Sequence, residues 1–169
     1  MTDPQRARLR TLLAERRAAR ETELQKVAQG SATPAAMLDL RPIDAPGFLA
    51  FAVELLAEND VDNALAAAEL ATAADPKSYD AWMALGAARA RSKQEAAALH
   101  AYAHAAGLRA DDVRLWCDVG ELKLSLLDYK GAAQALSRAI DLDPKAQTPA
   151  GKRAQALVAK AWAKAEKRG

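Results

Sequence analysis

Apolar and small side chains recur at helical spacing along the chain, and proline, aspartate and serine interrupt them at regular intervals. Residues 45–146 predict six short helices, and residues 4–29 predict a longer one before them. Thr148-Pro149 predicts the cap and first-turn proline of a last helix that ends near Lys167. Alanine supplies about a quarter of the residues. Because alanine is the strongest helix former, a β-rich fold is excluded.

One set of residue types recurs every 34 residues. An aromatic residue stands at Phe48, Trp82 and Trp116, and a small residue follows four positions later each time. Further small residues and a closing proline recur on the second helix, although Ala110 replaces one proline. The recurring small residues and the two closing prolines are Ala52, Gly86, Gly120, Ala64, Ala98, Ala132, Pro76 and Pro144.

This pattern resembles the tetratricopeptide repeat (TPR). The aromatic residues are expected to fill the space between paired helices, and the small residues to allow the helices to cross closely. The predicted fold is all-α, an α-solenoid of three TPR helix pairs with an N-terminal helix and a C-terminal capping helix. Its predicted segments are a basic helix at 1–30, a linker at 31–44, repeats at 45–78, 79–112 and 113–146, and the capping helix at 147–169.

The predicted helix starts carry capping residues. Asp60, Ser78 and Asp128 stand where an N-cap is needed, and Asp111-Asp112 can supply one after Ala110. Ser92 with Glu95 has the spacing of a capping box.

Charge is unevenly distributed, with basic ends on an acidic middle. Residues 1–30 carry seven basic and four acidic groups, residues 45–146 ten and fifteen, and residues 147–169 six and one. The basic residues lack an aromatic or groove-entering motif, so nucleic acid is not an expected partner. The chain shows neither an apolar signal region nor a stretch of transmembrane length, so we expect a cytoplasmic protein without stable membrane insertion.

Residues that carry chemistry are few. His100 and His104 have a spacing suited to a metal, but no third ligand with matching spacing is visible. Cys117, the single cysteine, has no histidine partner and is expected to serve as a small apolar residue. The sequence therefore predicts no enzyme activity, no cofactor and no metal. The open alternative, a metal protein built on the two histidines, would show stoichiometric metal after purification.

In TPR arrays the first helix of each pair lines a concave groove. Helical periodicity selects the inward positions, and the resulting surface is apolar at one end and of mixed charge at the other. The expected peptide-binding residues are Leu49, Val53, Leu56, Met83, Ala87, Arg91, Arg114, Cys117, Glu121 and Leu124. Simple packing against neighbouring helices is the alternative for each of them.

TPR domains that hold acidic chaperone C-termini need lysine, asparagine and arginine at fixed groove positions. Only Arg114 has the required charge here; Leu49, Val53, Ala84 and Asp118 occupy the other positions. Such a carboxylate clamp is therefore not expected.

Three repeats, a preceding helix and linker, and a trailing helix together resemble the class II chaperones of bacterial type III secretion. The likeness is strongest over Ser78 to Leu108 and next over Val113 to Leu136. It implies a bacterial cytoplasmic chaperone that holds an extended apolar segment of a hydrophobic translocator. It also implies a homodimer formed through residues 4–29. The alternative function is a general TPR scaffold in another bacterial assembly or envelope complex.

The linker suggests one further hypothesis. Residues 34–46 place prolines around Leu38, Leu40 and Ile43, the kind of segment that such a groove accepts. The linker is then expected to occupy the groove until a client displaces it, with simple packing on the first repeat as the alternative.

Overall fold

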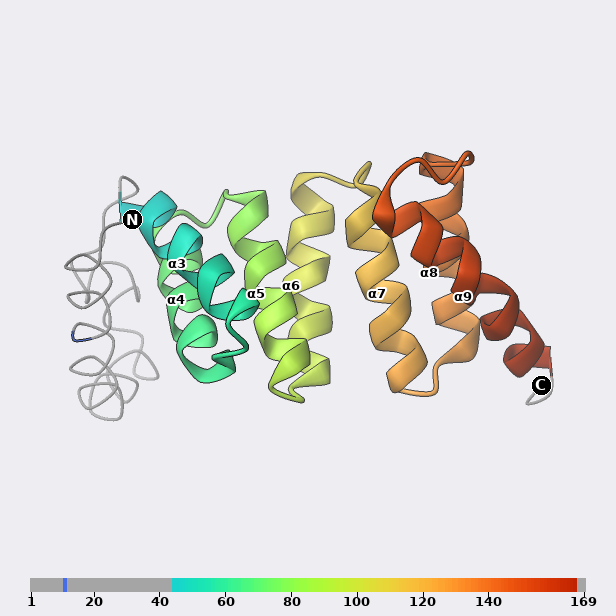
Figure 1. Cartoon of the computed structure of the whole chain (residues 1–169), viewed down its shortest axis with the longest axis horizontal. Coiled ribbons are helices and arrows are strands. Elements are labelled where there is room, and N and C mark those ends of the chain that lie inside the picture. The colour runs from blue at the N-terminus through green and yellow to red at the C-terminus, as the bar shows by residue number, and fades with distance from the viewer. Residues whose placement is uncertain (1–10, 12–43, 167–169) are drawn as a thin grey trace. The chain divides into compact units, whose positions relative to one another are not determined.

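A computed structural model describes Thr11 and residues 44–166, and these ranges contain helices and turns but no strand (Figure 1). The predicted N-terminal helix and linker lie outside the described residues, except for Thr11, which is helical, and Asp44. The helices after Asp44 are α3 (Ala45–Ala57), α4 (Val61–Ala74), α5 (Tyr79–Arg91), α6 (Glu95–Leu108), α7 (Val113–Ser125), α8 (Tyr129–Leu142) and α9 (Pro149–Glu166).

The chain divides after Ser92 into two compact units, Met1–Ser92 and Lys93–Gly169. In the first unit α3 packs against both α4 and α5, and α4 packs against α5. In the second unit α6 packs on α7, α7 packs on α8, and α9 packs on both α7 and α8. The two helices of the second predicted repeat therefore belong to different units.

Capping side chains start most of these helices as predicted. Asp60 accepts a hydrogen bond from the Asn63 amide at 3.4 Å, and Ser78 accepts one from the Ala81 amide at 3.2 Å. Asp128 accepts from the Gly131 amide at 2.9 Å. Asp112 accepts from the Arg114 amide at 2.7 Å, so the start of α7 is capped although the usual proline is replaced by Ala110. These bonds satisfy first-turn amides that have no partner within the helix.

The capping box predicted at Ser92 and Glu95 is wrong. The N-cap of α6 is Gln94, whose side chain makes no capping hydrogen bond. Ser92 instead ends α5, and its hydroxyl donates to the Arg89 carbonyl at 3.0 Å. Lys93 then takes a left-handed conformation with φ of 62°. The equivalent turns have the same left-handed residue at Asn59 and Leu127, and the residue that follows it, Asp60 or Asp128, is the N-cap. Ser92 stands before this residue, at the end of α5, and is therefore too early in the chain to cap α6.

Alanine dominates the core of the first unit. Phe51, Leu55 and Ala52 of α3 are fully buried together with several alanines of α4. Small side chains on one helix let large ones on the other pack between them, as the repeat pattern predicts. The fully buried α4 alanines are Ala64, Ala67, Ala68 and Ala71.

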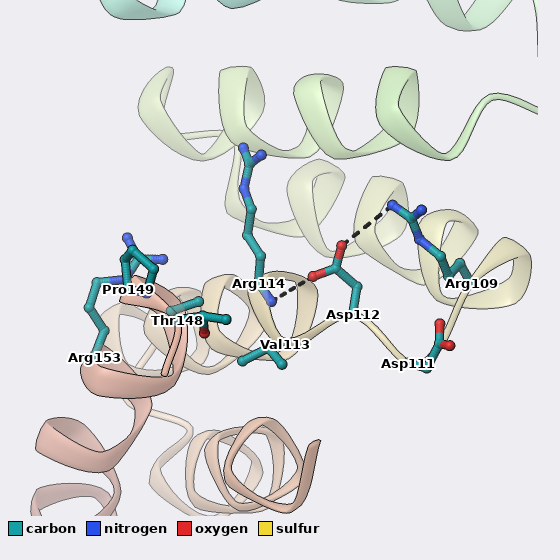
Figure 2. Close-up of a pocket in the computed structure, with 9 residues that line it drawn as sticks. Arg109, Asp111, Asp112, Val113, Arg114, Thr148, Pro149 and Arg153 are labelled. Atoms are coloured by element: carbon teal, nitrogen blue, oxygen red, sulfur yellow. Dashed lines mark hydrogen bonds and ion pairs between the residues drawn. The ribbon is translucent and has the colours of Figure 1, made fainter. Parts of the chain in front are cut away.

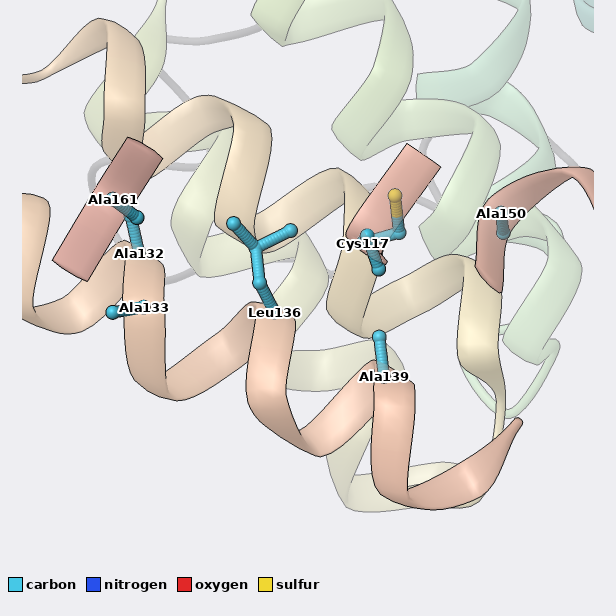
Figure 3. Close-up of a cluster of buried hydrophobic side chains, with 8 residues drawn as sticks. Cys117, Ala132, Ala133, Leu136, Ala139, Ala150 and Ala161 are labelled. Carbon is cyan, nitrogen blue, oxygen red and sulfur yellow. The ribbon is translucent and has the colours of Figure 1, made fainter. Parts of the chain in front are cut away.

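The second unit has a continuous core made by three helices (Figure 3). Its buried members are Cys117, Ala132, Ala133, Leu136, Ala139, Ala150, Ala154 and Ala161. A Cβ atom at Gly120 would lie 2.6 Å from Leu136 Cγ and 2.7 Å from Leu136 Cδ2. Because Leu136 is itself fully buried, α7 and α8 can cross here only with glycine at position 120.

Helix α9 begins with the predicted cap and is tied to the end of α8. Thr148 Oγ1 accepts a hydrogen bond from the Gly151 amide at 3.0 Å. Buried Asp143 accepts from the amides of Gln147 and Thr148, both at 2.9 Å, and from the Thr148 hydroxyl at 2.8 Å. A Cβ atom at Gly151 would lie 2.2 Å from Asp143 Oδ2, so this glycine makes room for the carboxylate.

The sequence spacing of α9 places Leu157, Val158, Trp162 and Ala165 on one apolar side, and this prediction is only partly correct. Leu157 and Val158 pack against the core as expected, but Trp162 is exposed. At that turn of the helix fully buried Ala161 occupies the core-facing position, and this turns the neighbouring tryptophan outward.

Gly120→Ala is expected to destabilise the chain by about 1–3 kcal/mol, because the added methyl group overlaps Leu136. The thermal unfolding midpoint, measured by circular dichroism, checks this. Gly107→Ala is the matched control: a Cβ atom there meets nothing within 4 Å, and alanine should stabilise α6 by up to about 1 kcal/mol. Equal effects at the two positions would contradict the crossing described for α7 and α8.

Asp143→Asn is expected to reduce stability at neutral pH but not in acid. Hydrogen bonds from the Thr148 and Gln147 amides and the Thr148 hydroxyl hold the pKa of Asp143 below its usual value. A carboxyl with a lowered folded-state pKa stabilises the fold above its unfolded pKa, and that contribution is lost as the pH falls. Urea unfolding should show a gap between variant and wild type at pH 7 that shrinks below about pH 4. A gap that stays constant with pH would contradict the role of the charge.

Candidate functional site

The expected binding residues of the first unit divide into exposed and buried ones. Val53 is 55% exposed, Leu49 and Ala87 are partly buried, and Arg91 is exposed. Leu56 and Met83 are buried, with Met83 only 3% exposed. We call the accessible surface the α3–α5 face; it consists of Leu49, Ala50, Val53 and Ala57 on α3 and Ala87, Ala90 and Arg91 on α5.

Apart from one arginine the α3–α5 face is apolar. Helix α3 has a single charged residue, Glu54, in its thirteen positions. Leu49, Ala50, Val53 and Ala57 follow the i, i+1, i+4, i+8 spacing of one helix face. Exposed valine is ordinary when isolated, but a whole exposed stripe of apolar side chains on one helix is a surface suited to another protein.

Arg91 has a structural contact within this face. Its Nη1 donates a hydrogen bond to the carbonyl oxygen of Leu56, which lies in the last turn of α3. Carbonyls at the end of a helix have no partner within the helix, and an arginine there also meets the negative end of the helix dipole. Arg91 therefore ties the end of α5 to the end of α3.

The expected residues of α7 lie mostly beneath α9. Cys117 is fully buried in the core of the second unit, and Leu124 is partly buried against the same core. Burial, more than the neighbouring Glu121 charge, raises the pKa of the Cys117 thiol to about 11. The thiol donates to Glu121 Oε1 at 3.6 Å. A protonated, buried thiol lacks the thiolate character that a nucleophile needs.

An ion-pair network joins α7 to α9. Arg153 of α9 places Nη2 2.9 Å from Asp118 Oδ1 and Nε 3.3 Å from Glu121 Oε1. Arg114 Nε lies 3.6 Å from Asp118 Oδ2. Burial raises the pKa of Asp118 despite the two arginines that favour its charged form. Of the residues expected on α7, Arg114 stays the most accessible, with 62% of its side chain exposed.

A pocket of about 660 Å³ opens in the second unit beside this network (Figure 2). The turn before α7, the first turn of α7 and the first turn of α9 form its wall. Its lining residues are Arg109, Asp111, Asp112, Val113, Arg114, Thr148, Pro149, Ala150 and Arg153. Three arginines from three separate segments thus surround one pocket.

The sequence identified only one of these three arginines, Arg114. Arg153 lies 35 positions from Asp118, and Arg109 lies at the end of α6. The spacing of Lys152, Arg153, Lys160 and Lys164 separates them from the apolar side of α9, and the residue pattern carries no signal that Arg153 contacts α7. The sequence indicates a contact between α9 and α7 only indirectly, because a C-terminal capping helix is expected to cover an apolar face of the helices before it.

Residues suited to catalysis or metal binding do not gather elsewhere in the described part of the chain. His100 and His104 are both exposed on α6. Within the described residues, no three or more histidine, cysteine, aspartate or glutamate side chains are placed to hold a metal ion. The described helices also include none that is both long and apolar enough to cross a membrane.

Comparison of the whole chain with known proteins places the fold. No family model matches the sequence, and no curated protein matches it. Solved structures do match. A type III secretion complex from Aeromonas hydrophila has a TM-score of 0.69 at 18% identity, covering 86% of this chain and 98% of that one.

Two further solved structures match with a similar TM-score, a second type III secretion protein and a human TPR domain. The Yersinia enterocolitica type III secretion chaperone SycD, in complex with a peptide of the translocator YopD, has a TM-score of 0.63 at 20% identity. The match covers 73% of this chain and 94% of that one. The first TPR domain of human RPAP3 has a TM-score of 0.67 at 17% identity, covering 75% and 95%. The predicted fold class is thereby confirmed: the chain has the TPR-type α-solenoid fold, which type III secretion chaperones share.

Cys117 is expected to resist alkylation in the folded chain. With a pKa of about 11, its thiolate fraction at pH 8 is about a hundredfold below that of an ordinary cysteine, and burial adds to this protection. Mass spectrometry after iodoacetamide treatment measures the effect, because the chain has a single cysteine. The chain unfolded in urea is the control and should react fully. Rapid modification of the folded chain would show that α9 leaves α7 uncovered.

Proposed function

We propose that this chain is a non-catalytic chaperone or adaptor that holds an extended apolar segment of a client protein on the α3–α5 face. The observation that carries the proposal is the exposed apolar stripe of α3, with Val53 at its centre. An extended peptide leaves its side chains free to enter shallow apolar sites, and the small side chains Ala50, Ala57 and Ala87 leave room for them.

The comparisons support a narrower form of the proposal. SycD belongs to a structure that contains a peptide of the translocator YopD, and a further match is the CopN-Scc3 complex. A translocator chaperone of type III secretion, acting in the bacterial cytoplasm, is the corresponding function here. Its client is a hydrophobic secreted protein, and residues 4–29 are its proposed dimer arm.

The face has properties that suit such a client better than an acidic peptide. Its α3 part carries no basic side chain, and Arg91, the one basic residue of its α5 part, is engaged with the Leu56 carbonyl. Burial of apolar side chains is then the main favourable term in binding. Arg114, Glu121 and Leu124 remain proposed contacts of the second unit, with Arg114 and Glu121 the more accessible ones. Cys117 is fully buried in the core, so a client does not reach it in this structure.

A general TPR scaffold in another bacterial assembly is the second candidate. The first TPR domain of human RPAP3 matches this fold as well as the secretion chaperone SycD does, so the fold alone does not favour one kind of partner over the other. The two differ in the partner, since a scaffold binds folded components of a machine and a chaperone binds an unfolded secreted protein.

Val53→Asp is expected to abolish recovery of a hydrophobic secreted protein in affinity capture from the bacterial cytoplasm. A charge at an exposed position should change folding stability by less than about 0.5 kcal/mol, yet it must lose water when a client covers it. Leu126→Asp is the matched control, because Leu126 is an exposed leucine outside the face. Soluble machine components retained by Val53→Asp would favour the scaffold instead.

A further inference from the structure

The arginine-lined pocket of the second unit is not explained by an apolar client segment alone. It contains Arg109 from the turn before α7, Arg114 from the first turn of α7, and Arg153 from the first turns of α9. Figure 2 shows Arg114 between the other two.

Carboxylates outside the pocket hold two of these arginines, Arg114 and Arg153, in place. Asp118, which does not line the pocket, is only 16% exposed and pairs with both Arg114 and Arg153. Its Oδ2 lies 3.6 Å from Arg114 Nε. Since a guanidinium has five N–H groups, the Nη groups of Arg114 keep donors for a ligand. The side chain is 62% exposed, so a ligand can reach it.

The two acidic residues that line the pocket, Asp111 and Asp112, do not lie between Arg114 and Arg153. Asp112 caps α7 through the Arg114 amide at 2.7 Å and meets Arg109 Nη2 at 3.4 Å. Asp111 lies exposed at the end of the wall that is farther from Arg153 (Figure 2). The starts of α7 and α9 at Val113 and Pro149 add the positive ends of two helix dipoles. Asp118 and Glu121 balance the charges of Arg114 and Arg153. The wall between these two arginines therefore offers a ligand N–H donors and the positive ends of two helix dipoles rather than excess positive charge.

We propose that this pocket binds a carboxylate, namely an acidic side chain of the client, between Arg114 and Arg153. A planar carboxylate matches the planar guanidinium fork better than other anions of its size. Val113, Pro149 and Ala150 supply apolar contact for the methylene groups of an aspartate or glutamate. The assignment rests on the proposed function, since it names a second feature of the same client. Because Asp118 already balances part of the charge, the pocket contributes specificity more than affinity.

Titration of the ¹⁵N-labelled full chain with glutarate, followed by NMR, tests the pocket without any client. Glutarate should shift the amide signals of Val113, Arg114 and Ala150 in a saturable manner, and neutral glutaramide should leave them unchanged. Shifts spread over the whole chain, or equal shifts with glutaramide, would overturn the proposal.

Arg114→Gln should weaken glutarate binding about fivefold, the size expected for one partly exposed charge pair. Arg138→Gln is the matched control, since Arg138 stacks on Trp116, 4.8 Å from the ring centroid, outside the pocket. Arg114→Gln leaves Asp118 paired with Arg153, so the α7–α9 contact stays intact. Unchanged glutarate binding in this variant would also overturn the proposal.

Client capture separates the failure of this site from the failure of the proposed function. Val53→Asp should lose the client and keep glutarate binding. Arg114→Gln should retain less of the client at low salt, and 0.5 M salt should remove the difference from wild type. If wild type and Arg114→Gln retain the client equally well, the pocket does not bind an acidic side chain of the client. The proposal that the α3–α5 face binds the client would be unaffected.

Discussion

The close crossing of paired helices is the constraint on which the structure depends. Ala64 and Ala132 are fully buried at equivalent positions of α4 and α8, and Gly120 has no space for even a methyl group. The small residues at the crossing point bury little apolar surface. The large apolar side chains therefore pack in the space on either side of the crossing. The first helix of a pair then keeps one face that its own partner does not cover. That face must be covered by a neighbouring helix or be offered to another protein.

The two units use these alternatives differently. In the second unit α9 covers α7, burying Cys117 and binding Asp118 and Glu121 through Arg153. In the first unit no charged side chain interrupts the exposed stripe of α3 around Val53. The same repeat pattern thus produces a core surface in one case and an exposed apolar surface in the other. Arg153, which fastens α9 to α7, also lines a pocket together with Arg109 and Arg114.

The helices could be read from the sequence because each repeat carries its own start signals. Asp60, Ser78 and Asp128 cap helices with short local bonds, which depend on neighbours in sequence. The burial of single residues could not be predicted in the same way. Helical periodicity gives the face of the helix on which a side chain lies, but not whether another helix covers that face. Met83 and Cys117 were expected at the groove and are buried. Leu127, with φ of 62°, has no sequence signal for its left-handed conformation.

The central claim is that the α3–α5 face binds an extended apolar segment of one client. Photo-crosslinking in the bacterial cytoplasm, with benzoyl-phenylalanine at position 53, tests it most directly, because Val53 is the most exposed large apolar residue of the described chain. The account predicts a single adduct, mapped by mass spectrometry to a short apolar stretch of a hydrophobic secreted protein. Adducts to many unrelated proteins, or to the surface of a folded partner, would contradict it.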